Sequence, residues 1–417
     1  MQYKNFNLLD SLKKTISFKT IFSSYQNKTS FLFGLILALT IILILIFGSA
    51  VHTQGLIYLS YIAGIIPIIY FKIPRHFSRQ FLFFLFGFLI LWISTAWINY
   101  KSGTLESGLI NFNVLSYHVF FFTLIISIFY LWQKQEYKND LCIFLKTIFY
   151  LTLPIFSFLY FKIIYEIFIL GKEAAWGYTY RHLDAEMFLI WLISSFFIHS
   201  RWIKLLVAII VLSSMHFMSV RGGFLAGFLF IFFSYFLPWL KKFKPSHLLI
   251  FFVISSFIGY IFFYEIYFLL NKILLLDSSP RGINSGFTLR TSVWKIAWEH
   301  ILADPWTGIG YYIRPNPLSD PFNSGLHVHN FFLRIWVENG TPLFLYVCLT
   351  LLMTAYNIER KKLTWERGAF WAILFYYFFI PRHIQLNPMS IILYLIVIRS
   401  FLANNKLINL NNFRLKD

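Results

Sequence analysis

The sequence predicts an all-α membrane protein of about twelve transmembrane helices, with a large helical loop late in the chain on the outer side. Apolar residues make up 58% of the 417 residues and charged residues only 13%. Soluble proteins carry about 25% charged residues, so a surface this poor in charge needs lipid around most of it. Apolar runs of about 20 residues, the length that crosses a bilayer, recur from one end of the chain to the other. These observations exclude a soluble domain on a single anchor.

The first apolar run, 30–50, follows a basic segment, 1–29. The run is 21 residues long and lacks an Ala-x-Ala cleavage site, which favours a spanning helix over a signal peptide. We expect the basic segment to lie against the cytoplasmic leaflet, where anionic lipid attracts lysine.

Eleven further apolar runs complete the predicted set of spans. They are 54–71, 80–98, 113–132, 141–169, 187–200, 203–220, 223–240, 247–270, 343–357, 368–381 and 388–402. The predicted organisation is a cytoplasmic segment, nine spans, an outer loop, three spans and a cytoplasmic tail, at 1–29, 30–270, 271–342, 343–402 and 403–417.

Basic residues give the orientation. With the N-terminus inside, every connection predicted to be cytoplasmic contains lysine or arginine, as the positive-inside rule requires. The residues concerned are Lys72, Arg75, Arg79, Lys134, Lys138, Arg201, Lys204, Lys241, Lys242, Lys244, Arg360, Lys361, Lys362 and Arg367. The formal charge of +19 is therefore a topology signal, and we expect no nucleic-acid partner. Cys142 and Cys348 lie in apolar runs far apart, so no disulfide framework is expected.

Some basic residues fall on the outer side, where they are disfavoured. They occur in the segment 171–186, in the loop 271–342, and at Arg221, where two spans meet. Either they pair with local carboxylates or they hold an anionic ligand, and the sequence leaves both open.

Two helices are predicted inside the large loop. The first runs from about Leu289 to Ala303 and stops at Asp304-Pro305, because proline cannot continue it. Arg290 lies toward its apolar side, one turn before Trp294. A guanidinium facing inward needs an anion, because an unpaired buried charge is costly. The alternative is an arginine stacked on Trp294 with its charge in water.

The second loop helix is predicted to start near His327 and to end at Gly340, a natural helix C-cap. Asn330, Arg334 and Glu338 share one polar stripe, whereas His329 heads an apolar stripe. A histidine in such a place is more often a core residue than a catalyst. An imidazole with its ordinary pKa of about 6.5 nevertheless suits general-base chemistry near neutral pH. The segment Pro305–Tyr312 between the helices is rich in aromatic and turn residues, so it either packs as an aromatic belt or lines a sugar site.

Three motifs resemble the O-antigen ligase and polymerase superfamily. His329-Asn330 followed by nine residues and Gly340 is similar to the ligase motif, whose last position is Leu343 here instead of a small residue or tyrosine. The segment from Arg290 through Asp304-Pro305 to Gly310 resembles the pattern upstream of that histidine. Ser219-Val220-Arg221-Gly222 is similar to the Ser-x-Arg-Gly segment of the superfamily.

The resemblance implies a multi-span glycosyltransferase of the bacterial inner membrane with both termini cytoplasmic and the large loop periplasmic. The donor would be a glycan on undecaprenyl pyrophosphate and the acceptor a sugar hydroxyl of lipid A-core. His329 would be the general base, and Arg221 and Arg290 would bind the pyrophosphate, as arginine forks do. Weaker candidates for the site are Arg281, Arg314, Arg181, His327 and Asn330.

We expect no metal and no cofactor, because the chain contains no Asp-x-Asp pair to hold a divalent ion and arginine would take over the phosphate clamp. Two alternatives stay open. An O-antigen polymerase or a protein oligosaccharyltransferase would share the arginines but use another acceptor. A transporter would place ionisable residues near mid-membrane, and few lie there in this chain.

Overall fold

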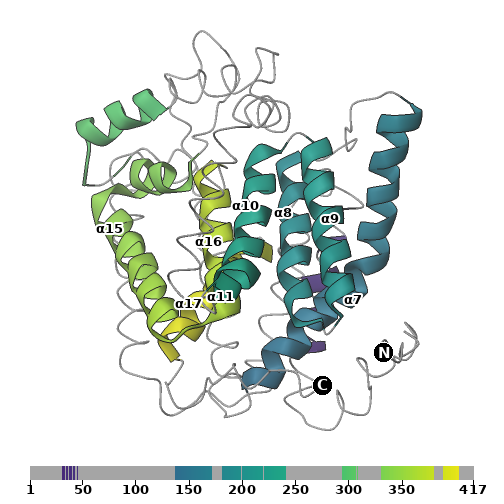
Figure 1. Cartoon of the computed structure of the whole chain (residues 1–417). Helices are drawn as coiled ribbons and strands as arrows, with labels where there is room; N and C mark the ends of the chain where they lie inside the picture. Colours follow the sequence, from purple (N-terminus) through teal and green to yellow (C-terminus); the bar gives the residue numbers. More distant parts are fainter. Residues whose placement is uncertain are drawn as a thin grey trace, which may run out of the picture. The chain divides into compact units, whose positions relative to one another are not determined.

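The structure is a computed structural model of the whole chain. It describes residues 137–170, 181–198, 200–218, 220–240, 294–306, 308, 330–379 and 388–402, and parts of 31–45. All regular secondary structure in these ranges is helical, in agreement with the predicted all-α class (Figure 1). Three of the described helices are long and apolar enough to span a membrane: Leu141–Ile169, Arg221–Trp239 and Phe331–Arg360. The predicted spans 54–71, 80–98, 113–132 and 247–270 lie outside the described residues, so the count of twelve stays a prediction.

The chain divides into two compact units. The first comprises Met1–Arg75, Leu115–Gly227 and Leu386–Ile398, and the second comprises His76–Val114, Phe228–Gln385 and Arg399–Asp417.

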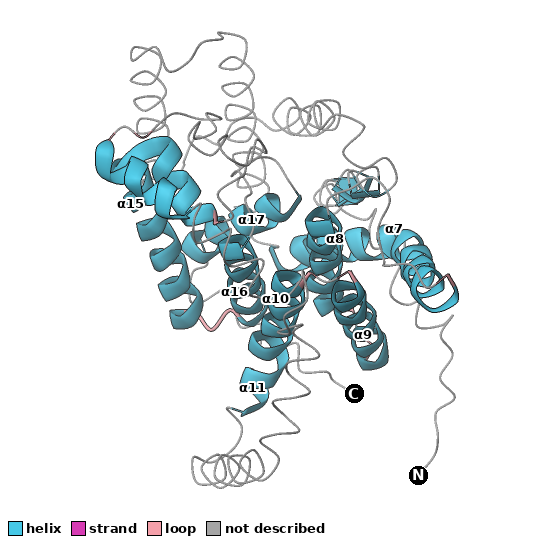
Figure 2. Cartoon of the chain, turned by 90° about the horizontal axis from the view of Figure 1, so that it is seen from above, coloured by secondary structure: helices cyan, strands magenta, loops and turns pink. Residues whose placement is uncertain are grey.

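The first unit is built around α8 (Arg181–Ser194), which packs against α7 (Tyr137–Ile164) and α9 (Arg201–Phe217) (Figure 2). A π-helical segment, Tyr165–Ile169, continues α7, and a 3-10 turn, Ser195–Phe197, follows α8. Every residue of α8 from Met187 to Ile193 is buried, as expected for a helix that is apolar all round. Trp191 stacks on Phe149 and Phe156, and its Nε1–H donates to the Phe149 carbonyl at 3.3 Å.

The predicted boundary of this helix was wrong. The sequence predicted a span at 187–200 and a charged outer connection at 171–186, but α8 begins at Arg181 and ends at Ser194. The error came from excluding charged residues from the helix. Asp184 and Glu186 are helical and fully buried, so the charged segment forms the first turns of an interior helix.

Two glycines allow the start of the next helix, α10 (Arg221–Ile231), to pack closely against its neighbours. A Cβ atom built on Gly223 would lie 3.1 Å from Ala185 Cβ, and one on Gly227 would lie 3.0 Å from Leu212 Cδ2. Small residues four apart let helices approach closely in membrane proteins. The first turns of α10 are therefore seated against α8 and α9. A π-helical segment, Phe232–Phe236, and α11 (Leu237–Leu240) follow α10.

The second unit contains α15 (Phe331–Arg360) and α16 (Thr364–Phe379), joined by a three-residue turn, and the last residues of α17 (Pro388–Leu402). Helices joined this tightly are antiparallel neighbours. The Cβ position of Gly368 on α16 is filled by Ser234, so the absence of a side chain there lets the segment Phe232–Phe236 approach α16. The bounds of α17 are those predicted for the last span.

Ion pairs stabilise one end of this unit, the end at which the turn between α15 and α16 lies. Arg399 pairs with Glu366, and Arg367 binds Glu359 through two contacts, Nε to Oε1 at 2.5 Å and Nη2 to Oε2 at 2.6 Å. The Lys361 ammonium donates to the Ser400 carbonyl at 2.5 Å, and burial, together with the neighbouring Arg360, lowers its pKa. This turn is one of the predicted basic inside connections, and two of its predicted basic residues, Lys361 and Arg367, have defined partners.

Candidate active site

Only three of the predicted site residues fall within the described part of the chain: Arg181, Arg221 and Asn330. The others lie outside it: His329, Arg290, Arg281, Arg314 and His327. The described elements next to Arg290 and His329 in the chain are the loop helix 294–303 and α15.

Asn330 is the N-cap of α15. Its backbone is extended, with φ −158° and ψ 117°, and its side-chain oxygen accepts from the backbone N–H of Leu333 at 3.0 Å. Asparagine is among the best N-cap residues, because it satisfies a donor that the first turn leaves open. Asn330 is 7% exposed, so its side chain is committed to this structural task.

The N-cap corrects the predicted start of the helix. The sequence placed the start near His327, with His329 at the head of an apolar stripe, whereas α15 begins at Phe331. The described helix therefore begins two residues after His329 in the sequence. The prediction failed because apolar periodicity does not register a capping side chain, and Asn330 as N-cap makes Phe331 the first helical residue.

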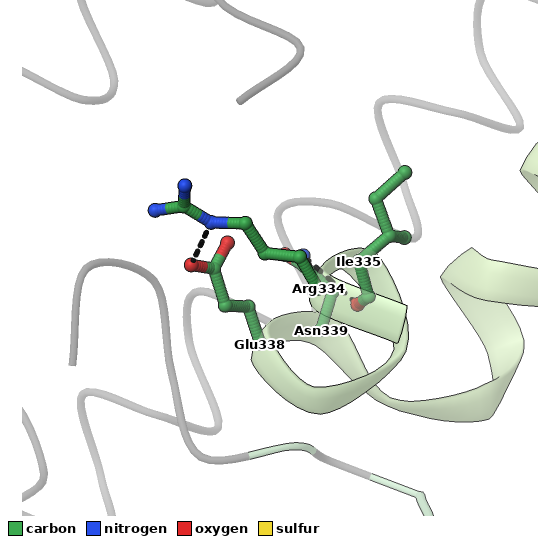
Figure 3. A network of polar contacts seen from close by, with 4 residues as sticks. All are labelled: Arg334, Ile335, Glu338 and Asn339. Atoms are coloured by element: carbon green, nitrogen blue, oxygen red, sulfur yellow. Dashed lines mark hydrogen bonds and ion pairs between the residues drawn. The ribbon is translucent and has the colours of Figure 1, made fainter. Parts of the chain in front are cut away.

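Arg334 and Glu338 form a buried ion pair on the first half of α15. Arg334 Nε donates to Glu338 Oε1 at 2.7 Å, and each side chain is only 9% exposed (Figure 3). The two side chains extend from the same face of the helix, with the guanidinium beyond the carboxylate. The sequence placed both on a polar stripe with Asn330, and their i, i+4 spacing was the visible signal of a pair. What the sequence did not reveal is that this stripe is buried.

The turn after the first loop helix packs against the middle of α15. The described part of that helix, 294–303, ends before Asp304-Pro305, as predicted. The Pro305 carbonyl accepts from the Thr341 N–H at 2.8 Å and from Thr341 Oγ1–H at 2.6 Å. Trp336 Nε1–H in turn donates to Thr341 Oγ1 at 2.9 Å.

These hydrogen bonds lie at the kink of α15. Gly340 has φ 74° and ψ 175°, so it interrupts the helix at the residue predicted to be its C-cap. Residues 331–339 thus form a short helix with its own direction, and the apolar span follows after the kink.

The two predicted loop helices also share a core. Ala297, Ile301 and Val337 are buried together, with Trp294 and Trp336 among the apolar side chains packed around them.

Aromatic rings connect this core with the end of α16. Phe331 stacks on Tyr377 with ring centroids 5.2 Å apart, and Trp294 lies edge-on to Phe378 at 6.3 Å. The start of α15 is thereby held between the loop helix and the end of α16. The backbone next to His329 is anchored by a cap, a buried ion pair and stacked rings.

In the first unit, Arg181 and Arg221 each begin a helix, α8 and α10. Because Gly223 packs against Ala185, the two helix starts lie at the same end of the unit. Arg221 is half-buried there, and the fully buried Asp184 and Glu186 flank Ala185 along α8. This end is the predicted outer one, and Arg221 and the two buried carboxylates lie at it.

The family model described as O-antigen ligase matches residues 205–348. The chain carries an O-antigen ligase domain. Among curated proteins, none matches the chain.

The O-antigen ligase domain covers most of α9, all of α10 and α11, the loop helix 294–303, and α15 as far as Cys348. All three quoted motifs fall inside it. The match supports assignment to the membrane-embedded, glycosyltransferase-like enzymes of the ligase and polymerase kind. Enzymes of this kind use a lipid-linked glycan as donor and a lipid as acceptor.

Within the described residues, no group of three or more histidine, cysteine, aspartate or glutamate side chains could hold a metal ion. The residues that the structure brings together around the loop half of α15 are an arginine, a glutamate, an asparagine and aromatic rings. Because the asparagine caps the helix and the arginine is paired with the glutamate, this set fixes the start of α15 next to the predicted site residues.

Proposed function

We propose that the protein is an O-antigen ligase. It transfers a glycan from undecaprenyl pyrophosphate to a sugar hydroxyl of lipid A-core at the periplasmic face of the bacterial inner membrane. The observation that carries the proposal is the family match over 205–348, which spans the His329-Asn330 motif and its glycine at 340. Gly340 has a positive φ, which explains why the motif has glycine at this position.

The proposed reaction is a direct displacement at the anomeric carbon of the donor sugar. His329 takes the proton of the acceptor hydroxyl, the oxygen attacks the anomeric carbon, and the bond from that carbon to the pyrophosphate oxygen breaks. Negative charge develops on the leaving lipid pyrophosphate, where Arg221 and Arg290 stabilise it. A single displacement inverts the anomeric configuration. The arginines supply the positive charge that a divalent metal supplies in other glycosyltransferases, so the reaction is proposed to be metal-independent.

Transfer to a growing polymer or to a protein hydroxyl is the alternative within the same superfamily. The pairing of His329 with Asn330 is the feature that favours the ligase, because it follows the ligase form of the motif. The acceptor is therefore the part of the proposal that most needs a direct test.

The test is the lipopolysaccharide profile of a deletion strain complemented with wild type or with His329→Ala at equal membrane levels. A ligase with His329 as its base predicts loss of capped lipopolysaccharide while lipid-linked polymer of normal length accumulates. Capping with a single repeat in the variant would indicate a polymerase. An unchanged profile in both the deletion and the variant strain would contradict the ligase and direct attention to protein acceptors.

A further inference from the structure

The loop helix 294–303 and the turn after it carry an apolar surface that stays largely exposed. Trp298 is 45% exposed, Leu302 is 65% exposed and Trp306 is 69% exposed. Trp298 and Leu302 are one turn apart on the helix, and Trp306 follows at the same spacing in the turn. The side chains that fix the helix to the protein are different ones, namely Ala297 and Ile301, which pack on Val337 of α15.

A second exposed row on the same helix is charged. Lys295 and Glu299 are both exposed and are also one turn apart. The helix therefore has a buried face on α15, an exposed apolar row and an exposed charged row. A helix with these three faces is suited to a boundary between protein, lipid and water.

The exposed apolar row lies next to the surface of α15 that begins its membrane span. Trp298 packs edge-on against Trp336 with ring centroids 5.4 Å apart, and Trp336 stacks on Phe344 at 4.4 Å, beyond the kink. The turn that carries Trp306 is hydrogen-bonded to Thr341, two residues before the predicted start of the span at 343.

Beyond the kink, the spanning part of α15 exposes an apolar stripe of its own. Leu345, Leu349, Leu352 and Tyr356 are between 51% and 66% exposed and recur at helical spacing. In a helix that crosses the bilayer, such a stripe faces lipid. The exposed surface of the loop helix is continuous, through Trp336 and Phe344, with the beginning of this span. Tryptophan is also the residue that gathers where acyl chains meet headgroups.

We propose that the helix 294–303 lies in the plane of the outer membrane interface, with Leu302, Trp298 and Trp306 inserted at the boundary between headgroups and acyl chains. The occupant of the exposed apolar surface is therefore lipid. Lys295 and Glu299 face the headgroup and water side. The helix acts as an interfacial anchor that holds the turn 304–308, and with it the kink of α15, at the height of the lipid headgroups. This inference does not depend on the identity of the glycan or of its acceptor.

The experiment uses the full-length protein in lipid nanodiscs that hold one copy each. Cys142→Ala and Cys348→Ala remove the two native cysteines, and single cysteines are then introduced and labelled with bimane. The test positions are Leu302→Cys and Trp306→Cys, the matched controls on the same helix are Glu299→Cys and Ala303→Cys, and Leu349→Cys marks the lipid-facing side of the span. Quenching is measured with lipids brominated near the headgroup, with lipids brominated deep in the chain, and with aqueous iodide.

Labels at Leu302 and Trp306 should be quenched several-fold more by shallow bromines than labels at Glu299 and Ala303, and they should be protected from iodide. The label at Leu349 should respond most to deep bromines, because an interfacial helix lies only about 5–10 Å into the boundary. Equal iodide quenching at Leu302 and Glu299 would overturn the proposal. Protection from iodide that arises only when nanodiscs hold two copies, or only when free oligosaccharide is added, would overturn it as well, in favour of a second copy or a sugar platform. If the Trp306 variant does not fold, the Leu302 comparison carries the test.

Discussion

Gly308 packs directly against the backbone of Gly340, and each glycine has a positive φ, 70° and 74°. A Cβ atom on Gly308 would lie 2.7 Å from the Gly340 nitrogen, 2.7 Å from the Val337 carbonyl oxygen and 2.8 Å from the Asn339 nitrogen. The neighbours are backbone atoms, which cannot move aside as the tip of a side chain can. This contact, together with the bonds from Thr341 to Pro305, joins the turn after the loop helix to the kink of α15.

Substituting Gly308 by alanine should destabilise the protein markedly. The substitution adds a clash with the backbone and the strain of a positive φ, which alone costs about 1–3 kcal/mol. The measurement is the thermal unfolding midpoint of the detergent-solubilised protein by fluorescence-detected size exclusion. Gly227→Ala is the matched control, because its Cβ would meet the end of the Leu212 side chain at 3.0 Å, which can shift. Equal midpoints for the two variants would show that the packing of Gly308 on Gly340 is not rigid.

Substituting Glu338 by glutamine should also destabilise the protein, because it removes the buried carboxylate charge to which Arg334 Nε donates. Breaking a buried ion pair by removing one member costs about 3–5 kcal/mol. Glu166→Gln is the control, because its i, i+4 partner Lys162 is 38% exposed and its ammonium can be solvated when the carboxylate charge is lost. The same unfolding measurement compares the two variants.

The double variant Arg334→Met/Glu338→Leu asks whether this pair serves more than stability. Replacing a buried ion pair by packed apolar side chains is often neutral or stabilising. If the pair only supports the fold, the double variant should regain the unfolding midpoint of the wild type and keep normal transfer activity. Normal stability with lost activity would show that the charges themselves act in the reaction.

Replacing Arg290 by lysine should reduce transfer by tenfold or more at equal protein levels, on the order of the loss of one good charge-assisted hydrogen bond. Lysine keeps the positive charge but loses the planar fork that binds a phosphate through two hydrogen bonds. Arg221→Lys should behave alike if Arg221 shares the role proposed for it. Lys295→Arg is the control, because Lys295 is exposed on the loop helix 294–303 and has no role in the proposed clamp. Full activity of Arg290→Lys would refute the clamp.

Chelation should leave the transfer reaction intact. In the proposed reaction the arginines supply the positive charge at the leaving group, so EDTA added to a membrane preparation should not change the rate of transfer from a lipid-linked donor. The assay measures the formation of capped lipid A-core, with and without added Mg²⁺. A strict requirement for Mg²⁺ would contradict the metal-independent reaction.

The sequence was most informative where one physical effect dominates. Charge depletion alone indicates a membrane protein, because water cannot solvate such a surface. Proline and glycine predict breaks without tertiary contacts, so the end of the loop helix at Asp304-Pro305 and the break at Gly340 were both confirmed. The helix bounds were least accurate where charged residues sit at helix ends. Arg181, Asp184 and Glu186 were assigned to a connection, yet they form the first turns of α8.

By itself, then, the sequence determined the helical class, the three motifs of the O-antigen ligase domain and the positions of the strongest helix breaks. Local backbone preferences and the cost of moving charge into lipid are sufficient for these. Only the tertiary structure decided that Arg334 and Glu338 are buried together, that α15 starts after His329, and that Gly308 lies on Gly340. The burial of the ion pair and the contact between the two glycines depend on which surfaces pack against one another, and residues far apart in the chain determine that. The start of α15 depends on the extended backbone of Asn330, which apolar periodicity along the chain does not show.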